Sequence, residues 1–151
     1  MLIKPIHSAD RTPHLISQLT QLWRQSVDAS HHFLTPAEIT AIEQEVPTAL
    51  RTVPQLLIAM NEQNDPTGFI GIDGSLIAML FITPTASSTG IGTALLQTSI
   101  QDYGATTVTV NEQNPRAQQF YEHRGFHVTD RQAIDDQGRP YPLLTMTYST
   151  D

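Results

Sequence analysis

Two glycines separated by one residue, Gly90 and Gly92, stand at a change in the character of the sequence. Before them an apolar run at 76–82, followed by Pro84, is short enough for a buried strand. After them the apolar residues of 91–103 recur at helical spacing. A glycine loop between a strand and a helix directs several backbone N–H groups toward one point at the positive end of the helix dipole. The chemistry expected there is phosphate binding, with an ordinary glycine-containing loop as the open alternative.

Asn114 and Tyr121 form a second group of residues that could do chemistry. The amide of Asn114 both donates and accepts hydrogen bonds, and the phenol of Tyr121 can release or take up a proton. Each also has a purely structural interpretation, since Asn114 could cap a helix that begins at Pro115, and Tyr121 could pack beside Phe120. The residues alone leave both pairs of interpretations open.

Histidines supply further candidates for proton transfer. His31 and His32 follow a predicted helix, and an imidazole titrates in the range needed to accept a proton from an amine. Either could instead be a solvated or helix-capping residue. His123 and His127 are separated by Gly125, which breaks the helix that would align them, and no third ligand stands nearby in the sequence. No metal site is therefore predicted.

The composition restricts the classes of protein to which the chain can belong. Its 151 residues, 39% hydrophobic and 15% charged, predict one soluble globular domain over 1–151, and no apolar stretch approaches the roughly 20 residues of a membrane span. The absence of cysteine excludes disulfides, thiolate metal sites and thiol nucleophiles, and it agrees with a cytoplasmic location. Fifteen acidic and eight basic residues give a net charge of −7, so a nucleic acid is not an expected partner.

The elements that must position these residues are predicted along the whole chain. Helices are expected from Pro13 with Thr12 as cap, from Pro36 with a Thr35–Glu38 capping box until Pro47 ends or kinks it, at 91–103 and at 115–124. Strands are expected at 2–6, 55–60, 68–72, 76–82, 106–110, 126–134 and 141–148. This order of elements predicts a single α/β or α+β domain.

The two motifs together resemble those of the GNAT-type superfamily of acetyl-coenzyme A-dependent N-acetyltransferases. That family places a Q/R-x-x-G-x-G/A loop after a central strand, and Gly90 and Gly92 match its glycines. Further along it places N-x-x-A-x-x-F-Y-x-x-x-G-F. The signature positions of this second motif are all matched, by Asn114, Ala117, Phe120, Tyr121, Gly125 and Phe126. In the loop, Ser87 replaces the family's Gln or Arg and leaves no local positive charge, so weaker pyrophosphate binding is expected.

The resemblance implies a GNAT-like fold with acetyl-coenzyme A as cosubstrate. The implied fold is a central mixed, largely antiparallel sheet of about six to seven strands flanked by about four helices, in which a central strand splays from its parallel neighbour. The pantetheine arm of the cosubstrate enters the gap between these two strands. The implied contacts come from backbone groups near Phe81 and Ile82, from the loop residues Ser87, Ser88, Thr89, Gly90, Ile91, Gly92 and Thr93, and from Asn114, Ala117 and Tyr121.

The implied reaction is acetyl transfer to a primary amine, with Tyr121 as the acid that protonates the departing thiolate. Reference pKa values near 10 for tyrosine and 8.5 for a thiol make this proton transfer uphill by about 1.5 pKa units, or roughly 2 kcal/mol. The carboxylate that many family members carry on the central strand is absent at 76–79, so His31 is the candidate base. His32, Glu112 and proton loss through water remain open as alternatives.

A narrower resemblance concerns the acceptor. Residues 26–34, 111–114 and 135–144 look like those of a small subgroup of bacterial acetyltransferases, some of which are regarded as protein-lysine acetyltransferases. The implied partner is a protein lysine or a small-molecule amine, acetylated by a monomer or homodimer that does not act at a membrane. The residues expected to bind the acceptor are His31, His32, Phe33 and Tyr141. A non-catalytic acyl-coenzyme A sensor and an unrelated phosphate-binding module remain as other functions.

Overall fold

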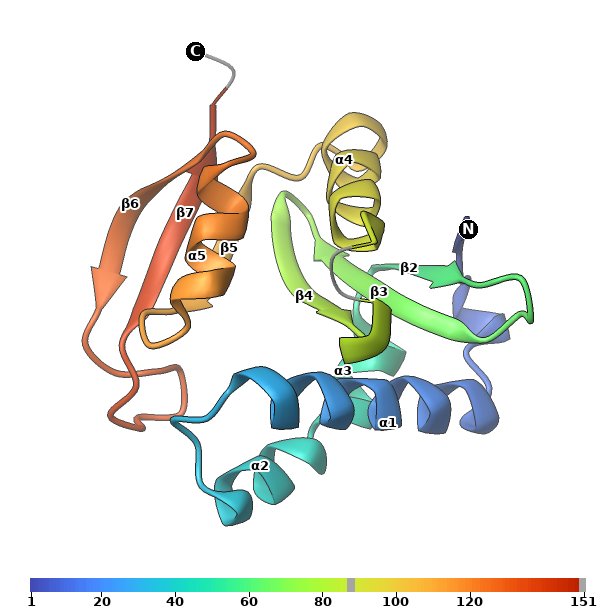
Figure 1. Ribbon diagram of the computed structural model, residues 1–151, viewed down its shortest axis with the longest axis horizontal. Helices are drawn as coiled ribbons and strands as arrows, with labels where there is room; N and C mark the ends of the chain where they lie inside the picture. Colours follow the sequence, from blue (N-terminus) through green and yellow to red (C-terminus); the bar gives the residue numbers. More distant parts are fainter. Residues whose placement is uncertain (87–88, 150–151) are drawn as a thin grey trace.

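A computed structural model describes residues 1–86 and 89–149, and within them seven strands form one mixed sheet in the order β1-β2-β3-β4-β5-β7-β6 (Figure 1). The strands are β1 Leu2–Pro5, β2 Gln55–Met60, β3 Pro66–Asp73, β4 Leu76–Ile82, β5 Thr107–Asn111, β6 Phe126–Gln132 and β7 Leu143–Tyr148. The helices are α1 Pro13–Ser30, α2 Pro36–Glu43, α3 Val46–Thr52, α4 Ile91–Tyr103 and α5 Pro115–Glu122, with 3-10 turns at Ser8–Asp10 and Pro84–Ala86. None of the described helices has the length and hydropathy to cross a membrane.

The sheet opens between its two central strands. β4 and β5 run parallel and are paired only at Leu76–Thr107 and Ile77–Val108, whereas the other neighbouring strands are antiparallel. Beyond Ile77, β4 stays paired with β3 as far as Ile82 but has no partner strand on its other side among the described residues. The predicted mixed, largely antiparallel sheet and its splayed central pair are therefore confirmed. The sheet consists of two halves, β1–β4 and β5–β7–β6.

Helices cover both faces of the β1–β4 half. In Figure 1, α1, α2 and α3 lie on one side of the sheet and α4 on the other. Leu56 and Ile58 of β2 pack in the apolar cluster of α1–α3, and so does Trp23, the predicted core tryptophan. Leu57 and Ala59 pack in the cluster that includes α4. Because successive strand residues face opposite sides, a strand buried on both faces is a continuous apolar run, as β2 is.

The starts of α1 and α2 follow from their capping residues. The hydroxyl of Thr12 accepts a hydrogen bond from the Leu15 N–H at 3.2 Å, and Thr35 and Glu38 form the predicted capping box. The structure differs from the prediction near Pro47, which lies in the first turn of a separate helix, α3, and does not end α2. Proline is tolerated there because a first-turn N–H has no intrahelical acceptor. The described residues thus form one helix more than predicted.

A buried arginine that was not predicted ties the N-terminal segment to the sheet. Arg11 is only 9% exposed, and its guanidinium donates hydrogen bonds to five backbone carbonyls. The acceptors, at 2.6 to 3.4 Å, are the carbonyl oxygens of Ile6, Leu50, Arg51, Val53 and Pro54. They belong to the chain that follows β1, to the last turn of α3 and to the connection from α3 into β2, so one side chain holds these segments together.

Candidate active site

A cavity of about 670 Å³ opens where the two halves of the sheet part. Its walls come from the end of α1, the second half of β4, the first turn of α4 and one face of α5. The predicted site residues that line it are His31, Phe81, Ile82, Gly90, Gly92, Thr93, Asn114, Ala117 and Tyr121. Residues from four separate stretches of the chain therefore meet around one hollow, as a site for a long ligand requires.

Some of the predicted cosubstrate contacts lie elsewhere. Thr89 and Ile91 line a second, smaller hollow, and the side chain of Ile91 is buried in the core. The N–H and the hydroxyl of Thr89 both donate to the carbonyl of Ala86, so these two donors are already occupied. Ser87 and Ser88 lie outside the described residues.

The first turn of α4 presents the N–H groups expected for an anion. Those of Ile91, Gly92 and Thr93 have no acceptor among the described residues, whereas the Ala94 N–H is bonded to the Gly90 carbonyl at 3.0 Å. Gly90 precedes the helix with a φ of 85°, where a side chain would cost about 1–2 kcal/mol. Three free donors at the positive end of a helix of 13 residues are suited to an anion such as a phosphate.

Two arginines that were not predicted also line the cavity, Arg116 and Arg124. Nε and Nη2 of Arg124 donate to the hydroxyl of Thr93 at 3.0 and 2.6 Å, and Nη1 donates to the carbonyl of Phe120 at 2.7 Å. The loop itself carries no positive charge, as its sequence predicts, but Arg124 brings one to its Thr93 from another part of the chain. The loop motif gave no sign of it, because Arg124 is 31 residues from Thr93 in the sequence and reaches it from the end of α5.

Asn114 does cap α5 and also faces the cavity. Its side-chain oxygen accepts a hydrogen bond from the Ala117 N–H at 3.3 Å, and Pro115 occupies the first helical position. The NH₂ group of the same amide has no acceptor among the described residues and lies in a residue that lines the hollow. The two interpretations of Asn114 are thus compatible, because the oxygen serves the helix and the nitrogen stays available to a ligand.

Tyr121 is packed on both sides and still open to the cavity. It is 5% exposed, and its ring meets those of Phe120 and Phe126 edge-on, with centroids 5.1 and 5.4 Å away. Its hydroxyl has no hydrogen-bond partner among the described residues, and burial raises its pKa above the ordinary range. Buried tyrosine hydroxyls usually find a partner, so one without a partner at a cavity wall is free for a ligand.

His31 caps the end of α1 and lines the cavity. The hydroxyl of Ser30 donates to the carbonyl of Ser26 at 2.8 Å and lies 2.8 Å from Nδ1 of His31. When the single proton of that hydroxyl lies on the Ser26 carbonyl, Nδ1 is the donor in the second bond and Nε2 is left unprotonated. Burial, and secondarily the charge of His32, lowers the pKa of His31. Both effects favour the neutral imidazole, the form that can accept a proton.

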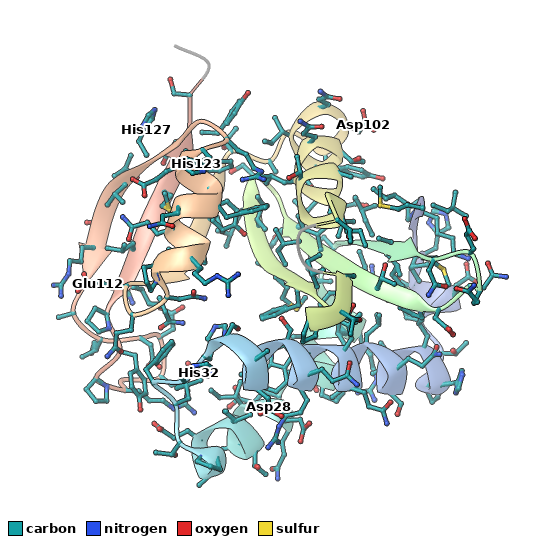
Figure 2. All side chains as sticks on the ribbon, viewed as in Figure 1. Asp28, His32, Asp102, Glu112, His123 and His127 are labelled. Carbon is teal, nitrogen blue, oxygen red and sulfur yellow. The ribbon has the colours of Figure 1, made fainter. Side chains whose placement is uncertain are left out.

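The other predicted acceptor residues lie beside the cavity and not in its wall. The ring of Phe33 is 5.4 Å from that of His31 and 5.6 Å from that of Tyr141, so three rings form a row that leads outward. The hydroxyl of Tyr141 donates to the carboxylate of Glu38, 2.6 Å from each oxygen. This bond raises the pKa of Tyr141 and lowers the pKa of Glu38. His32 is exposed and does not line the cavity (Figure 2).

The remaining candidates for base or metal chemistry are not at the cavity. Glu112 forms an ion pair with Arg131 and does not line the hollow. In Figure 2, His123 and His127 lie at the end of the molecule away from His32. Across the described ranges, 1–86 and 89–149, there is no group of three or more His, Cys, Asp or Glu side chains that could hold a metal ion.

Comparison with known sequences gives matches over most of the chain. A family model described as Acetyltransferase (GNAT) domain matches residues 20–145. Peptidyl-lysine N-acetyltransferase YjaB of Salmonella typhimurium is 40% identical over 131 residues, which span 87% of this chain and 90% of that protein. The protein of the same name from Escherichia coli K12 is also 40% identical, over 87% of this chain and 88% of its own length.

Two solved structures also match the chain over nearly its whole length. The solution structure of the apo form of YjaB from Escherichia coli matches with a TM-score of 0.85 and 35% identity, and the match covers 100% of both chains. The PaiA N-acetyltransferase of Thermoplasma acidophilum, crystallised in complex with coenzyme A, matches with a TM-score of 0.70 and 19% identity, over 98% of this chain and 100% of that one. At 19% identity the second likeness concerns the fold alone.

Proposed function

The chain belongs to the GNAT acetyltransferase family, and on that premise we propose that it transfers the acetyl group of acetyl-coenzyme A to the side-chain amine of a lysine in a protein. The observation that carries this proposal is the cavity between the sheet halves, where the free hydroxyl of Tyr121, the amide of Asn114 and the first turn of α4 meet. The choice of lysine rests on the two YjaB relatives, whose names specify peptidyl-lysine.

The cosubstrate half of the cavity fits an elongated thioester. Beyond Ile77, the edge of β4 that faces β5 carries backbone groups without a strand partner, among them those of Ile82. The backbone groups of Phe81 point the other way, toward Phe69 of β3, because Thr83 bonds Thr67 and hydrogen-bonded pairs alternate along antiparallel strands. An extended pantetheine arm would satisfy these groups as a strand would. The NH₂ group of Asn114 would bond the same arm, and the free N–H groups at the start of α4 would hold the pyrophosphate.

The acceptor half supplies the proton chemistry. The lysine nitrogen attacks the carbonyl carbon of the thioester, a C–N bond forms and the C–S bond breaks. Nε2 of His31 takes the proton that the nitrogen loses, and the hydroxyl of Tyr121 gives its proton to the departing sulfur. A neutral imidazole with a free lone pair and a protonated phenol are the forms that this assignment needs, and both are the forms favoured by burial at the cavity.

The direct test follows thiol release from acetyl-coenzyme A with an N-terminally blocked lysine peptide and with free amines. We expect saturable turnover with the peptide and one acetyl group on its lysine, detected by mass spectrometry. The alternative is a non-catalytic acyl-coenzyme A sensor, which the absence of an acid at 76–79 of β4 favours. Saturable binding without turnover on any acceptor would establish the sensor and overturn the enzyme.

His31→Gln is expected to lower kcat about tenfold at neutral pH, because the amine then loses its proton only to solvent. The base works in its neutral form, and the lowered pKa of His31 keeps it neutral until the pH falls below the ordinary histidine range. Wild-type activity should therefore decline as the pH drops through that pKa. The deficit of the variant should shrink as the pH rises toward about 10.4, where the amine deprotonates unaided.

The matched control is His14→Gln, an exposed position near the start of the same helix. It should leave both kcat and the pH profile unchanged. If His31→Gln lowers kcat by the same factor at every pH, the histidine positions the substrate and is not the base.

A further inference from the structure

We propose that Arg124 binds the pyrophosphate of acetyl-coenzyme A and supplies, from the end of α5, the positive charge that is missing at position 87. This inference rests on the proposed function, since it concerns the same ligand, but it concerns a residue at a variable position of the second motif, to which the motif assigns no role. It follows from three observations: the held position of the guanidinium, its place beside the first turn of α4, and its lack of an acidic partner.

The guanidinium of Arg124 is held in place by hydrogen bonds and still has unused N–H groups. Three of its five N–H groups are used, two on the hydroxyl of Thr93 and one on the carbonyl of Phe120. The guanidinium carbon also lies 3.8 Å from the centroid of the Phe120 ring, a cation–π contact that fixes the plane of the group. Two N–H groups therefore remain for a ligand, one on Nη1 and one on Nη2.

The second observation is the place of the guanidinium at the start of α4. Thr93 is the third residue of that helix, so the guanidinium lies beside the turn whose N–H groups at 91–93 have no acceptor among the described residues. The hydroxyl of Thr93 accepts two hydrogen bonds from Arg124, so its own proton is left to donate. An anion at this position would receive backbone, hydroxyl and charged donors at once. The ring of Phe120 can pack this closely against α4 because residue 92 is a glycine. A Cβ at that position would lie 3.3 Å from the ring.

The charge of Arg124 is not neutralised within the protein. Arg24, Arg131 and Arg139 each form an ion pair with a carboxylate. Arg116 and Arg124, which both line the cavity, have no carboxylate partner in the part of the chain that the structure describes, although the protein carries fifteen acidic residues. A cation kept free of acids at a cavity of an acidic protein is suited to an anionic ligand.

The test measures the Kd of three ligands for Arg124→Gln by calorimetry. The ligands are coenzyme A, 3′-dephospho-coenzyme A, which keeps the pyrophosphate, and pantetheine, which has no phosphate. Loss of a charge-assisted contact is expected to raise the Kd of the first two about tenfold and to leave that of pantetheine unchanged. Arg51→Gln is the matched control, since it removes one positive charge from an exposed side chain that does not line the cavity.

Each other result overturns the proposal. An equal loss with pantetheine would mean that Arg124 only shapes the cavity, and no loss with any ligand would mean that it makes no contact. A rise in the Kd of coenzyme A that is absent for 3′-dephospho-coenzyme A would mean that Arg124 binds the 3′-phosphate. An equal loss in Arg51→Gln would indicate a general effect of charge. Because the readout is binding, a protein that binds coenzyme A but acetylates nothing would end the proposed function and leave this inference standing.

Discussion

Tyr121→Phe is expected to lower kcat for acetyl transfer at least tenfold while the Kd for coenzyme A stays unchanged. The phenylalanine ring would keep the edge-on contacts with Phe120 and Phe126, so the wall of the cavity is preserved. Only the hydroxyl is lost, and it has no partner among the described residues. Without it the sulfur must leave as a bare thiolate, and general acid catalysis ordinarily contributes about a hundredfold or more.

The raised pKa of Tyr121 refines this prediction. Reference values make the proton transfer to sulfur uphill by roughly 2 kcal/mol, and burial of the phenol increases that figure. The thiolate forms against the same apolar wall, and desolvation raises its pKa in the same direction. Tyr121 also stays protonated through the neutral and moderately alkaline range, so an alkaline decline of kcat should not arise from this residue.

Rate and binding are to be measured together for Tyr121→Phe and for Tyr103→Phe, a control at the end of α4 outside the cavity. The control should match the wild type in both quantities. Unchanged turnover in Tyr121→Phe would remove the acid role and leave Tyr121 as a packing residue. A large rise in Kd alone would make it a binding residue.

Arg11→Met should lower the free energy of unfolding by about 3 kcal/mol, because it removes the donors of five carbonyls. Methionine keeps much of the apolar stem, so the loss reports mainly on the hydrogen bonds. For a chain of this length the melting temperature should fall by about 10 °C. Urea unfolding with an unchanged m-value would show that stability, and not compactness, has changed.

The control for this variant is Arg51→Met, whose side chain is exposed on the neighbouring helix α3. It should change stability by no more than about 0.5 kcal/mol. A loss below 1 kcal/mol in Arg11→Met would mean that water replaces the guanidinium at little cost. The cavity does not include Arg11, so the folded fraction should keep its activity.

Local sequence signals predicted local structure well. The cap at Thr12, the capping box at Thr35 and the positions of the strands depend on residues a few positions apart, and these were confirmed. The error near Pro47 was also local, since proline fits either just after a helix or in its first turn, and the sequence alone did not distinguish the two.

Contacts between distant residues could not be read in the same way. Arg124 reaches Thr93 across 31 positions, and Arg11 reaches Val53 across 42. Arg11 lies in no motif and Arg124 occupies a variable position of one, and only the packing of helices against the sheet brings the partners together. The hydrogen bond from Ser30 to the carbonyl of Ser26, beside His31, is an intermediate case. The two residues are one helical turn apart, so this bond could have been predicted from the sequence.

The two residue pairs that join β4 to β5 also have a thermodynamic consequence. With so few bonds between them, the two halves of the sheet are held together mainly by packing, and a ligand inserted between them would act as a removable eighth strand. Occupancy and folding are then linked, and at a hundred times its Kd the ligand would add about 2.7 kcal/mol to stability. Amide exchange along β4 beyond Ile77 should slow on saturation with coenzyme A, and an unchanged rate would argue against the link. The free energy of unfolding of the protein would then rise with the concentration of its own cosubstrate.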